Sequence, residues 1–381
     1  MTTSTPLPSS PPLPVPDLAA SLRDVTNSYK FYWLLAILDH VREDGAATVA
    51  IEELVARMVA AVWYPSNYFR LSFGKQDKLG EAALALRDAA QLPPNAPQAQ
   101  VMDAARAHMA AGSAAGRLIR RLDKYVVYRF LRPFFAAQVR GAPDWEVNRR
   151  VVALAEQSFA GDAPPLYRFA DEGRSIELHP RWQAYLHHNL AIVTGFCLWN
   201  LVTYLQRNNP NVPNIAGKLA EPGQRDLGAA RRFWRTALAV QGPLRCVYSG
   251  ELLESVASLD HFLPWSFVAH DLLWNIAPTA ASVNSAKSDR LPDFARYFEP
   301  FAAQQYAAVQ AVAQQAHSGP LVNSRVIMYQ RQSARVCQQW SARVYQASDR
   351  TPAQSCILPG NHRDREELCQ AGERTQWRFE K

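Results

Sequence analysis

The sequence predicts a mainly α-helical protein in which a helical N-terminal domain precedes a small ββα module. Apolar residues recur every three or four positions along most of residues 18–210, which is the period of an amphipathic helix. Residues 244–295 instead alternate short strand-like runs with turns and concentrate several polar residues. We therefore expect four parts: a tail at 1–17, a helical domain at 18–210, a module at 211–347 with its core at 244–295, and a C-terminal tail at 348–381.

Composition excludes several classes of protein. The 381 residues are 48% hydrophobic and 20% charged, which is typical of a soluble chain with more than one domain. No apolar run approaches the ~18 residues of a membrane helix, and the five cysteines are scattered rather than spaced as a disulfide framework. We expect a cytoplasmic protein without a membrane partner. The net charge of +7 suits a polyanionic ligand but also fits a basic protein that binds no nucleic acid.

The N-terminal domain begins after a tail rich in Thr, Ser and Pro, which we expect to be disordered or to form polyproline helix. Helices follow around Phe31–Leu38, over Ile51–Trp63 and around 78–90, and prolines end the last two. Residues 166–178 predict a hairpin, and a long helix is expected from about 180 to 205. The run Asn208–Pro213 is the clearest break and marks the expected end of this domain.

One predicted helix of this domain is strongly basic. Its cations recur at steps of three and four residues, opposite an apolar face formed by Leu118, Leu122, Val126 and Phe130. A solvated face is one reading, and a surface that follows nucleic-acid phosphates is the other. The cations are Arg117, Arg120, Arg121, Lys124 and Arg132.

The candidate site lies in the stretch 259–292. It holds Asp260 beside His261, then Asn275, and then Asn284 three residues before Lys287. Hydrolysis of a phosphodiester needs an activated water and a cation that neutralises charge on the phosphate. A neutral histidine can accept the proton of water, and carboxylate and amide oxygens are ligands for a hard divalent cation.

Three elements are expected to bring these residues together. Strands at Arg245–Ser249 and Ser258–Pro264 precede a helix that begins near Thr279, which is a ββα order. Helices at about 293–317 and 324–347 should wrap this module. The tail from 348 onward is polar and has weak structural signals.

The order and spacing of these polar residues resemble the HNH (ββα-metal) endonucleases, in the variant whose third letter is asparagine, over roughly residues 244–295. The resemblance implies a DNA endonuclease of the kind used in bacterial restriction or anti-phage defence. It makes His261 the general base, Asp260 and Asn284 the ligands of one Mg²⁺ or Mn²⁺ ion, and Asn275 a brace for the loop that orients the base. We add Lys287 as a catalytic candidate and Arg290 as a nucleic-acid contact.

The sequence departs from this family at a second metal site. Many HNH proteins carry a structural zinc held by two CxxC pairs, and here only Cys246 remains of the four ligands. We therefore expect no structural zinc. Apolar packing must hold the module instead, and the available side chains are Phe262, Leu263, Trp265, Phe267, Leu272, Leu273 and Trp274.

Two alternatives to a DNA nuclease stay open. The protein could keep the HNH fold without activity, as a nucleic-acid-binding or scaffold protein, or it could cleave RNA. The N-terminal domain could also bind a partner protein or a second copy of the chain.

Overall fold

The structure, a computed structural model, describes residues 7–23, 25–43, 45–221, 223, 225–316 and 376–377. This part of the chain is mainly helical, with small sheets of two or three strands. It divides into two compact units, residues 1–222 and 223–381. Among the residues described, no helix is long and apolar enough to cross a membrane.

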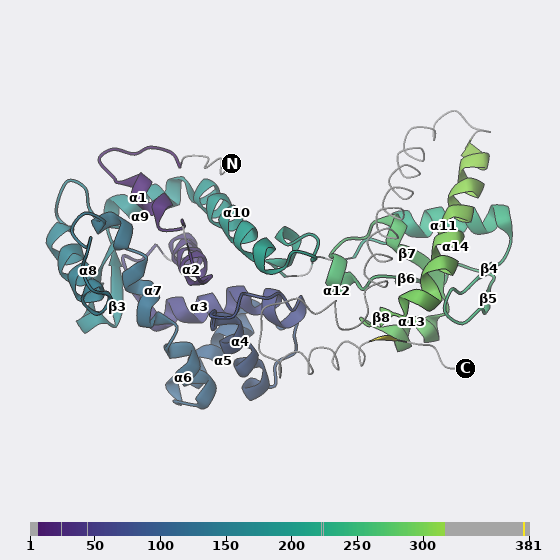
Figure 1. Cartoon of the computed structure of the whole chain (residues 1–381), viewed down its shortest axis with the longest axis horizontal. Coiled ribbons are helices and arrows are strands. Elements are labelled where there is room, and N and C mark those ends of the chain that lie inside the picture. The colour runs from purple at the N-terminus through teal and green to yellow at the C-terminus, as the bar shows by residue number, and fades with distance from the viewer. Residues whose placement is uncertain are drawn as a thin grey trace. The chain divides into compact units, whose positions relative to one another are not determined.

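The N-terminal unit is built around two adjacent helices, α2 and α3, whose buried side chains recur at helical spacing (Figure 1). The helices of this unit are α1 (Val15–Ala20), α2 (Tyr29–Glu43), α3 (Ile51–Trp63), α4 (Leu79–Ala90), α5 (Gln98–Ala110), α6 (Ala114–Arg120), α7 (Asp123–Arg129), α8 (Asp144–Ser158), α9 (Pro180–His188) and α10 (Leu190–Asn208).

The expected disordered tail is wrong for residues 7–17. Leu13 and Val15 are buried, and α1 begins at Val15. The Ser21 hydroxyl at the end of α1 donates a hydrogen bond to the Phe130 carbonyl. Apolar residues placed between the prolines supply enough buried surface to hold this segment against the helices.

A three-stranded antiparallel sheet lies in the N-terminal unit, with strand order β1-β3-β2. Strands β2 (Tyr167–Ala170) and β3 (Ser175–Leu178) form the predicted hairpin, which pairs Phe169 with Ile176. The third strand, β1 (Thr48–Ala50), was not expected. Three residues are too few to show the alternation that identifies a strand.

Two predicted helices are interrupted. The basic helix divides into α6 and α7, followed by a short 3-10 helix, η2 (Arg132–Phe135). The long helix after residue 180 divides at Asn189 into α9 and α10.

The segment Asn208–Pro213 belongs to the N-terminal unit rather than ending it. Asn209 is buried, its Oδ1 accepts a hydrogen bond from the Ser72 backbone N–H, and its Nδ2 donates to the Ser72 carbonyl, both at 2.8 Å. The division between the units follows residue 222, not residue 210. A run of Asn and Pro predicts a turn but does not show which unit holds the turn.

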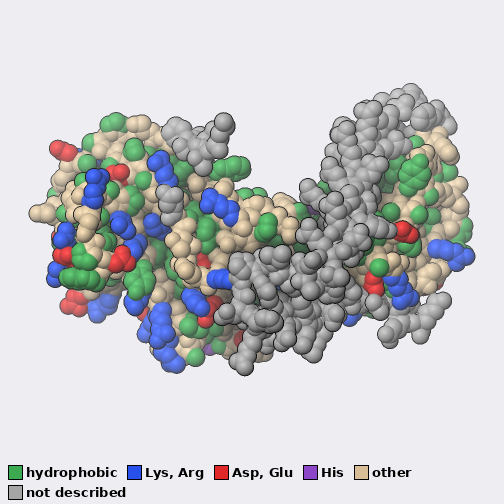
Figure 2. Space-filling model, in the orientation of Figure 1, with side chains coloured by type: hydrophobic (Ala, Val, Ile, Leu, Met, Phe, Trp, Pro, Cys, Tyr) green, Lys and Arg blue, Asp and Glu red, His purple; other side chains and the backbone are tan. Residues whose placement is uncertain are grey.

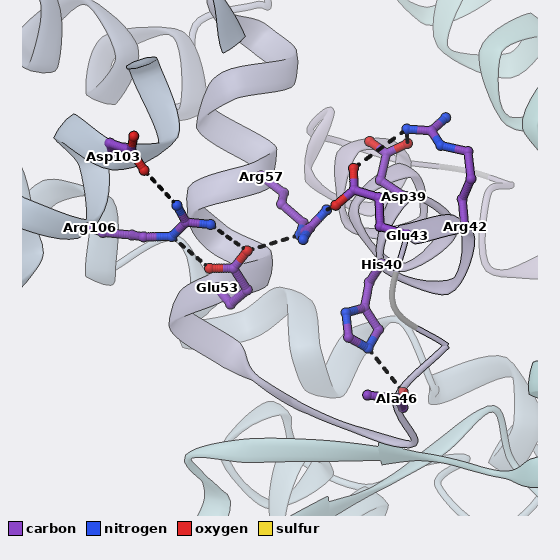
Figure 3. Close-up of polar contacts among 9 residues, drawn as sticks. All are labelled: Asp39, His40, Arg42, Glu43, Ala46, Glu53, Arg57, Asp103 and Arg106. Atoms are coloured by element: carbon purple, nitrogen blue, oxygen red, sulfur yellow. Dashed lines mark hydrogen bonds and ion pairs between the residues drawn. The ribbon is translucent and has the colours of Figure 1, made fainter. Parts of the chain in front are cut away.

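An ion-pair network ties α2, α3 and α5 together (Figure 3). The buried guanidinium of Arg57 lies 2.6 Å from Glu43 and 3.1 Å from Glu53. Glu53 also pairs with Arg106, at 2.8 Å, and Arg106 reaches Asp103. The two pairs with Glu43 and Glu53 balance the charge of Arg57, which would otherwise be costly to bury.

The second unit carries the polar stretch. Its elements are α11 (Gly228–Gln241), β4 (Leu244–Arg245), β5 (Leu252–Leu253), β6 (Ser258–His261), α12 (Trp265–Val268), η5 (Leu273–Asn275), β7 (Ile276–Thr279), α13 (Ala281–Lys287), β8 (Leu291–Pro292), α14 (Phe294–Ala316) and β9 (Gln376–Trp377). Helix α14 occupies the position expected for 293–317 and packs against α11 (Figure 1). The helix expected at 324–347, and the expected tail apart from β9, lie outside the described residues.

Strands β6 and β7 form an antiparallel ribbon that is followed directly by α13, which gives the ββα order. The strand expected at Arg245–Ser249 is wrong. Only its first residue, Arg245, belongs to a strand, β4, which pairs with β5. Strand β7 was not predicted, for two reasons. It contains Pro278, which lacks an N–H group, and all four of its residues are buried, so that buried and exposed positions do not alternate.

Apolar side chains from both faces of this ribbon form the core of the second unit. The indole of Trp234 in α11 donates a hydrogen bond to the Ile276 carbonyl. Among the expected packing residues, Phe262, Leu263 and Trp265 are buried, and Phe267, Leu273 and Trp274 are partly buried. Leu272 is an exception, since 45% of it is exposed.

Candidate active site

Strand β6 places Asp260 and His261 in the interior of the second unit, with only 6% and 5% of each residue exposed. The two neighbours lie opposite Ala277 and Ile276 of β7. Successive side chains on a strand point to opposite faces, so the two functional groups have different surroundings.

The Asp260 carboxylate has two partners from outside its strand. The Tyr248 hydroxyl donates to Oδ2 at 2.8 Å. The ammonium of Lys287 lies 3.2 Å from Oδ1 and 3.1 Å from Oδ2. Burial raises the pKa of Asp260, and the positive charge of Lys287 opposes that rise.

Lys287 connects α13 to both residues of the pair. It is fully buried, and its ammonium also donates to the His261 carbonyl at 2.7 Å. Burial lowers the pKa of Lys287, while the charge of Asp260 opposes that change. An ammonium at this position fixes the carboxylate and the backbone that follows it.

The ring of His261 is held by a residue that sequence reasoning missed. Its Nε2 atom lies 2.8 Å from Oδ1 of Asp271. The carboxylate accepts a hydrogen bond from Nε2–H, which leaves the lone pair of a neutral ring on Nδ1. Burial lowers the pKa of His261, and the hydrogen bond that its ring donates to Asp271 raises the pKa in part.

Asp271 also reaches the segment that precedes α11. Its Oδ2 atom accepts a hydrogen bond from the backbone N–H of Asp226 at 2.8 Å. A single carboxylate therefore joins His261 to the beginning of the second unit. No sequence pattern predicts this role, because Asp271 lies in an irregular loop without helical or strand periodicity.

Asn275 is fully buried and fixes the chain just beyond His261. Its Oδ1 accepts from the Leu263 N–H and its Nδ2 donates to the Leu263 carbonyl, both at 2.8 Å. The Phe262 N–H donates to the Asn275 carbonyl. These bonds satisfy the backbone of a segment that has left the regular strand.

Asn284 attaches α13 to β6. Its Nδ2 atom donates to the Ser258 hydroxyl at 2.8 Å and to the Leu259 carbonyl at 3.1 Å, beside Asp260 in the chain. This use of the amide nitrogen leaves Oδ1 as the atom that can face a cation. Among the described residues, no group of three or more His, Cys, Asp or Glu side chains could hold a metal ion.

The donor set fits a hard cation that keeps much of its water. Asp260 and Asn284 offer one carboxylate and one amide oxygen. Mg²⁺ is commonly bound by one or two protein oxygens together with water and substrate phosphate, whereas zinc prefers nitrogen and sulfur ligands.

Cys246 lies at the end of β4 and joins it to β7. Its sulfur is 3.1 Å from the Thr279 hydroxyl. Burial acts to raise the pKa of this thiol, but hydrogen bonds from Ser249, Thr279 and Ala280 outweigh burial and hold the pKa below its ordinary value. The absence of a structural zinc stays a prediction.

The candidate nucleic-acid contacts of the N-terminal unit are all exposed: Arg117, Arg120, Arg121 and Lys124. Lys and Arg side chains gather at the lower edge of this unit in Figure 2, where Figure 1 shows α6. Arg120 is partly neutralised, since its Nε lies 2.9 Å from Glu52. In the second unit, the exposed Arg290 bonds to the carbonyls of Ala286 and Lys287 at the end of α13.

Residues 246–293 match a known protein family, described as HNH endonuclease. The matched segment contains Asp260, His261, Asn275, Asn284 and Lys287. No curated protein and no solved structure matches the chain. This part of the chain is therefore an HNH domain, which points to nuclease activity.

Proposed function

Because residues 246–293 form an HNH domain, we propose that the protein is a metal-dependent endonuclease that hydrolyses phosphodiester bonds of DNA. One observation supports this most directly. A buried histidine, held through Nε2 by Asp271, follows a buried carboxylate in the same strand. This arrangement provides a base and, one residue earlier in the chain, an oxygen ligand for a cation.

In this proposal His261 is the general base. The bond to Asp271 fixes the ring, so that Nδ1 accepts the proton of the attacking water. Because burial lowers the pKa of His261 below its ordinary value of 6.5, the ring is neutral at pH 7 and able to accept a proton.

Asp260 and Asn284 are the proposed ligands of one Mg²⁺ or Mn²⁺ ion. When bound, such an ion neutralises charge on the phosphate and on the departing oxygen. Lys287 was a catalytic candidate, but its full burial favours a positioning role. Its ammonium orients the Asp260 carboxylate, and Asn275 fixes the chain after His261.

The proposed substrate is DNA, and the proposed setting is restriction or anti-phage defence. The net charge of +7 and the exposed cations of α6 and α7 favour a polyanion. The inactive-scaffold alternative is less well supported, because Asp260, His261 and Lys287 are held in one hydrogen-bonded arrangement.

A plasmid-nicking assay with Mg²⁺ or Mn²⁺ tests the proposal, with single-stranded RNA as a second substrate. His261→Ala should reduce the rate by ~10²–10⁴-fold, which is the usual effect of losing a positioned base. His270→Ala removes a nearby histidine of the same segment and should retain activity. If the wild-type protein cuts neither substrate with either metal, the inactive alternative holds. Equal cutting by His261→Ala and wild type would show that the base is misassigned.

A further inference from the structure

Three cations from separate elements of the N-terminal unit lie near enough for the charges of two to act on the third. Lys30 lies in the first turn of α2, Arg129 ends α7, and Arg132 begins η2. Of the three, only Arg132 belongs to the basic pattern that the sequence shows between residues 117 and 132.

A chain of buried hydrogen bonds places these elements beside one another. The Trp33 indole in α2 donates to the Tyr167 hydroxyl at 3.1 Å, and that hydroxyl donates to the Val127 carbonyl in α7 at 2.7 Å. Lys30 precedes Trp33 by three residues, so the two side chains share a face of α2. Arg129 and Arg132 follow Val127 within five residues.

The backbone between the two arginines is also fixed. The Ser21 hydroxyl donates to the Phe130 carbonyl at 2.7 Å. This bond ties the segment between α7 and η2 to the end of α1. The cluster is therefore held by packed helices rather than by a loop tip.

Positive charge in the cluster exceeds negative charge. Arg129 pairs with Asp144 at 2.8 Å, and 78% of that carboxylate's side chain is exposed. The Nε atom of Arg129 is buried and has no hydrogen-bond partner. Among the described residues, no carboxylate pairs with Lys30 or Arg132. Three cations thus share one solvent-screened carboxylate.

The pKa of Lys30 is lowered in this environment. Burial, followed by the charges of Arg132 and Arg129, lowers its pKa from 10.5 to about 8. Both charges that act on Lys30 are positive. Arg132 is exposed, so solutes can reach the cluster from solvent. An anion placed among the three groups would reduce their repulsion.

We propose that Lys30, Arg129 and Arg132 form a binding site for one phosphate group. Guanidinium groups match phosphate oxygens with paired donors, and an ammonium adds a compact charge. The excess of two positive charges over Asp144 favours a phosphate, whether the dianion of a monoester or the monoanion of a backbone phosphodiester. The phosphate belongs either to a nucleic-acid backbone or to a small phosphorylated compound. Binding does not depend on cleavage by the HNH domain.

Thermal unfolding of the full-length protein tests the site, with inorganic phosphate compared against NaCl of equal ionic strength. A ligand that binds only the folded state raises the melting temperature as its concentration increases. Wild type should be stabilised more by phosphate than by NaCl. Lys30→Gln should weaken phosphate binding about tenfold or more, because it removes a charge-assisted hydrogen bond. Lys78→Gln, which removes a 62% exposed lysine of the same unit, should bind phosphate like wild type.

Arg132→Gln gives a second variant whose exposed position carries little risk to folding. Each variant is also titrated with a DNA duplex in the absence of divalent metal. Loss of both phosphate protection and duplex affinity would assign the site to a nucleic-acid backbone. Loss of phosphate protection with unchanged duplex affinity would assign it to a small phosphorylated compound. Equal protection of wild type by phosphate and NaCl, or wild-type protection in both variants, overturns the proposal.

Discussion

The Nε2 atom of His261 and the Oδ1 atom of Asp271 lie 2.8 Å apart, although the two residues belong to a strand and to an irregular loop. This contact leaves the lone pair of a neutral His261 ring on Nδ1. It also links His261 to the segment that enters the second unit, because the backbone N–H of Asp226 donates to the same carboxylate.

Asp271→Ala should lower kcat about 10–100-fold, which is the usual effect of removing a residue that orients a functional histidine. The acid limb of the rate profile should also move to lower pH, because the hydrogen bond to Asp271 raises the pKa of His261. Asp271→Asn, which keeps an acceptor, should recover part of the rate. Activity from pH 5 to 9 is compared with Glu254→Ala, an exposed carboxylate of the same unit. An unchanged pH profile in Asp271→Ala argues against the orienting role.

The Lys287–Asp260 pair predicts an asymmetric effect on stability. Lys287→Met leaves a buried carboxylate without its cation, and losing one partner of a buried pair costs about 3–5 kcal/mol. The double variant Asp260→Asn/Lys287→Met removes both charges and should be less destabilised than Lys287→Met alone. Calorimetric melting of wild type, Asp260→Asn, Lys287→Met and the double variant completes the cycle. If the effects of the single variants simply add, the pair is not coupled in the folded protein.

The polar positions of the site could be read from the sequence, but their partners could not. Asp260, His261, Asn275 and Asn284 stand in a recognisable order and spacing. The contact of Asp271 with His261 depends instead on tertiary geometry, which the local sequence does not show. Ala269 adopts a left-handed conformation, with φ 53°, and ends α12 just before the loop that carries Asp271. No sequence pattern predicts a left-handed conformation at an alanine, because this conformation favours glycine.

The fold shows the same division between periodic and irregular segments. Helices with clear apolar periodicity, such as α3, were predicted at Ile51–Trp63 as the structure has them. Strand β7 was missed because Pro278 argues against a strand, and the packing of residues 7–17 was missed because their composition resembles a disordered tail. In each case long-range burial overrides the local signal.

Metal dependence should follow from the two oxygen ligands. Chelation should abolish cleavage, and Mg²⁺ or Mn²⁺ should restore it. Asp260→Ala and Asn284→Ala should need more metal than wild type, because each removes one oxygen donor. Cleavage is measured across a Mn²⁺ titration, and purified protein is analysed for zinc. Stoichiometric zinc in protein prepared without added metal would contradict both the proposed ion and the expected loss of the structural zinc site.

Lys30 should make stability depend on pH in alkaline solution. Its pKa is lowered from 10.5 to about 8 by folding, so the unfolded chain binds more protons between these values. Stability therefore rises with pH across that window, and the destabilising effect of the charge is fully present below about pH 8. Without phosphate, Lys30→Gln should raise the melting temperature at pH 7, and the gain should shrink toward pH 10. A gain that is constant with pH would show that Lys30 is not the titrating group.

The exposed cations of α6 and α7 should control DNA affinity rather than cleavage chemistry. Each neutralised duplex phosphate contributes ~0.9 to the log-log slope of affinity against salt. We choose Arg117, Arg121 and Lys124 for replacement by Gln, because Arg120 is already paired with Glu52. The triple variant should bind all duplex sequences more weakly and flatten the salt slope by about two to three units.

The matched control replaces three exposed arginines elsewhere on the same unit, Arg140, Arg181 and Arg207, so that the net charge changes equally. Binding is measured between 50 and 300 mM salt. This range of about sixfold in salt concentration resolves slope changes of this size. A control that loses as much slope as the α6–α7 variant would mean that total charge governs binding. Unchanged affinity and slope in the α6–α7 variant would make this face a solvated surface, and the N-terminal unit would then serve another purpose, such as binding the phosphate proposed at Lys30.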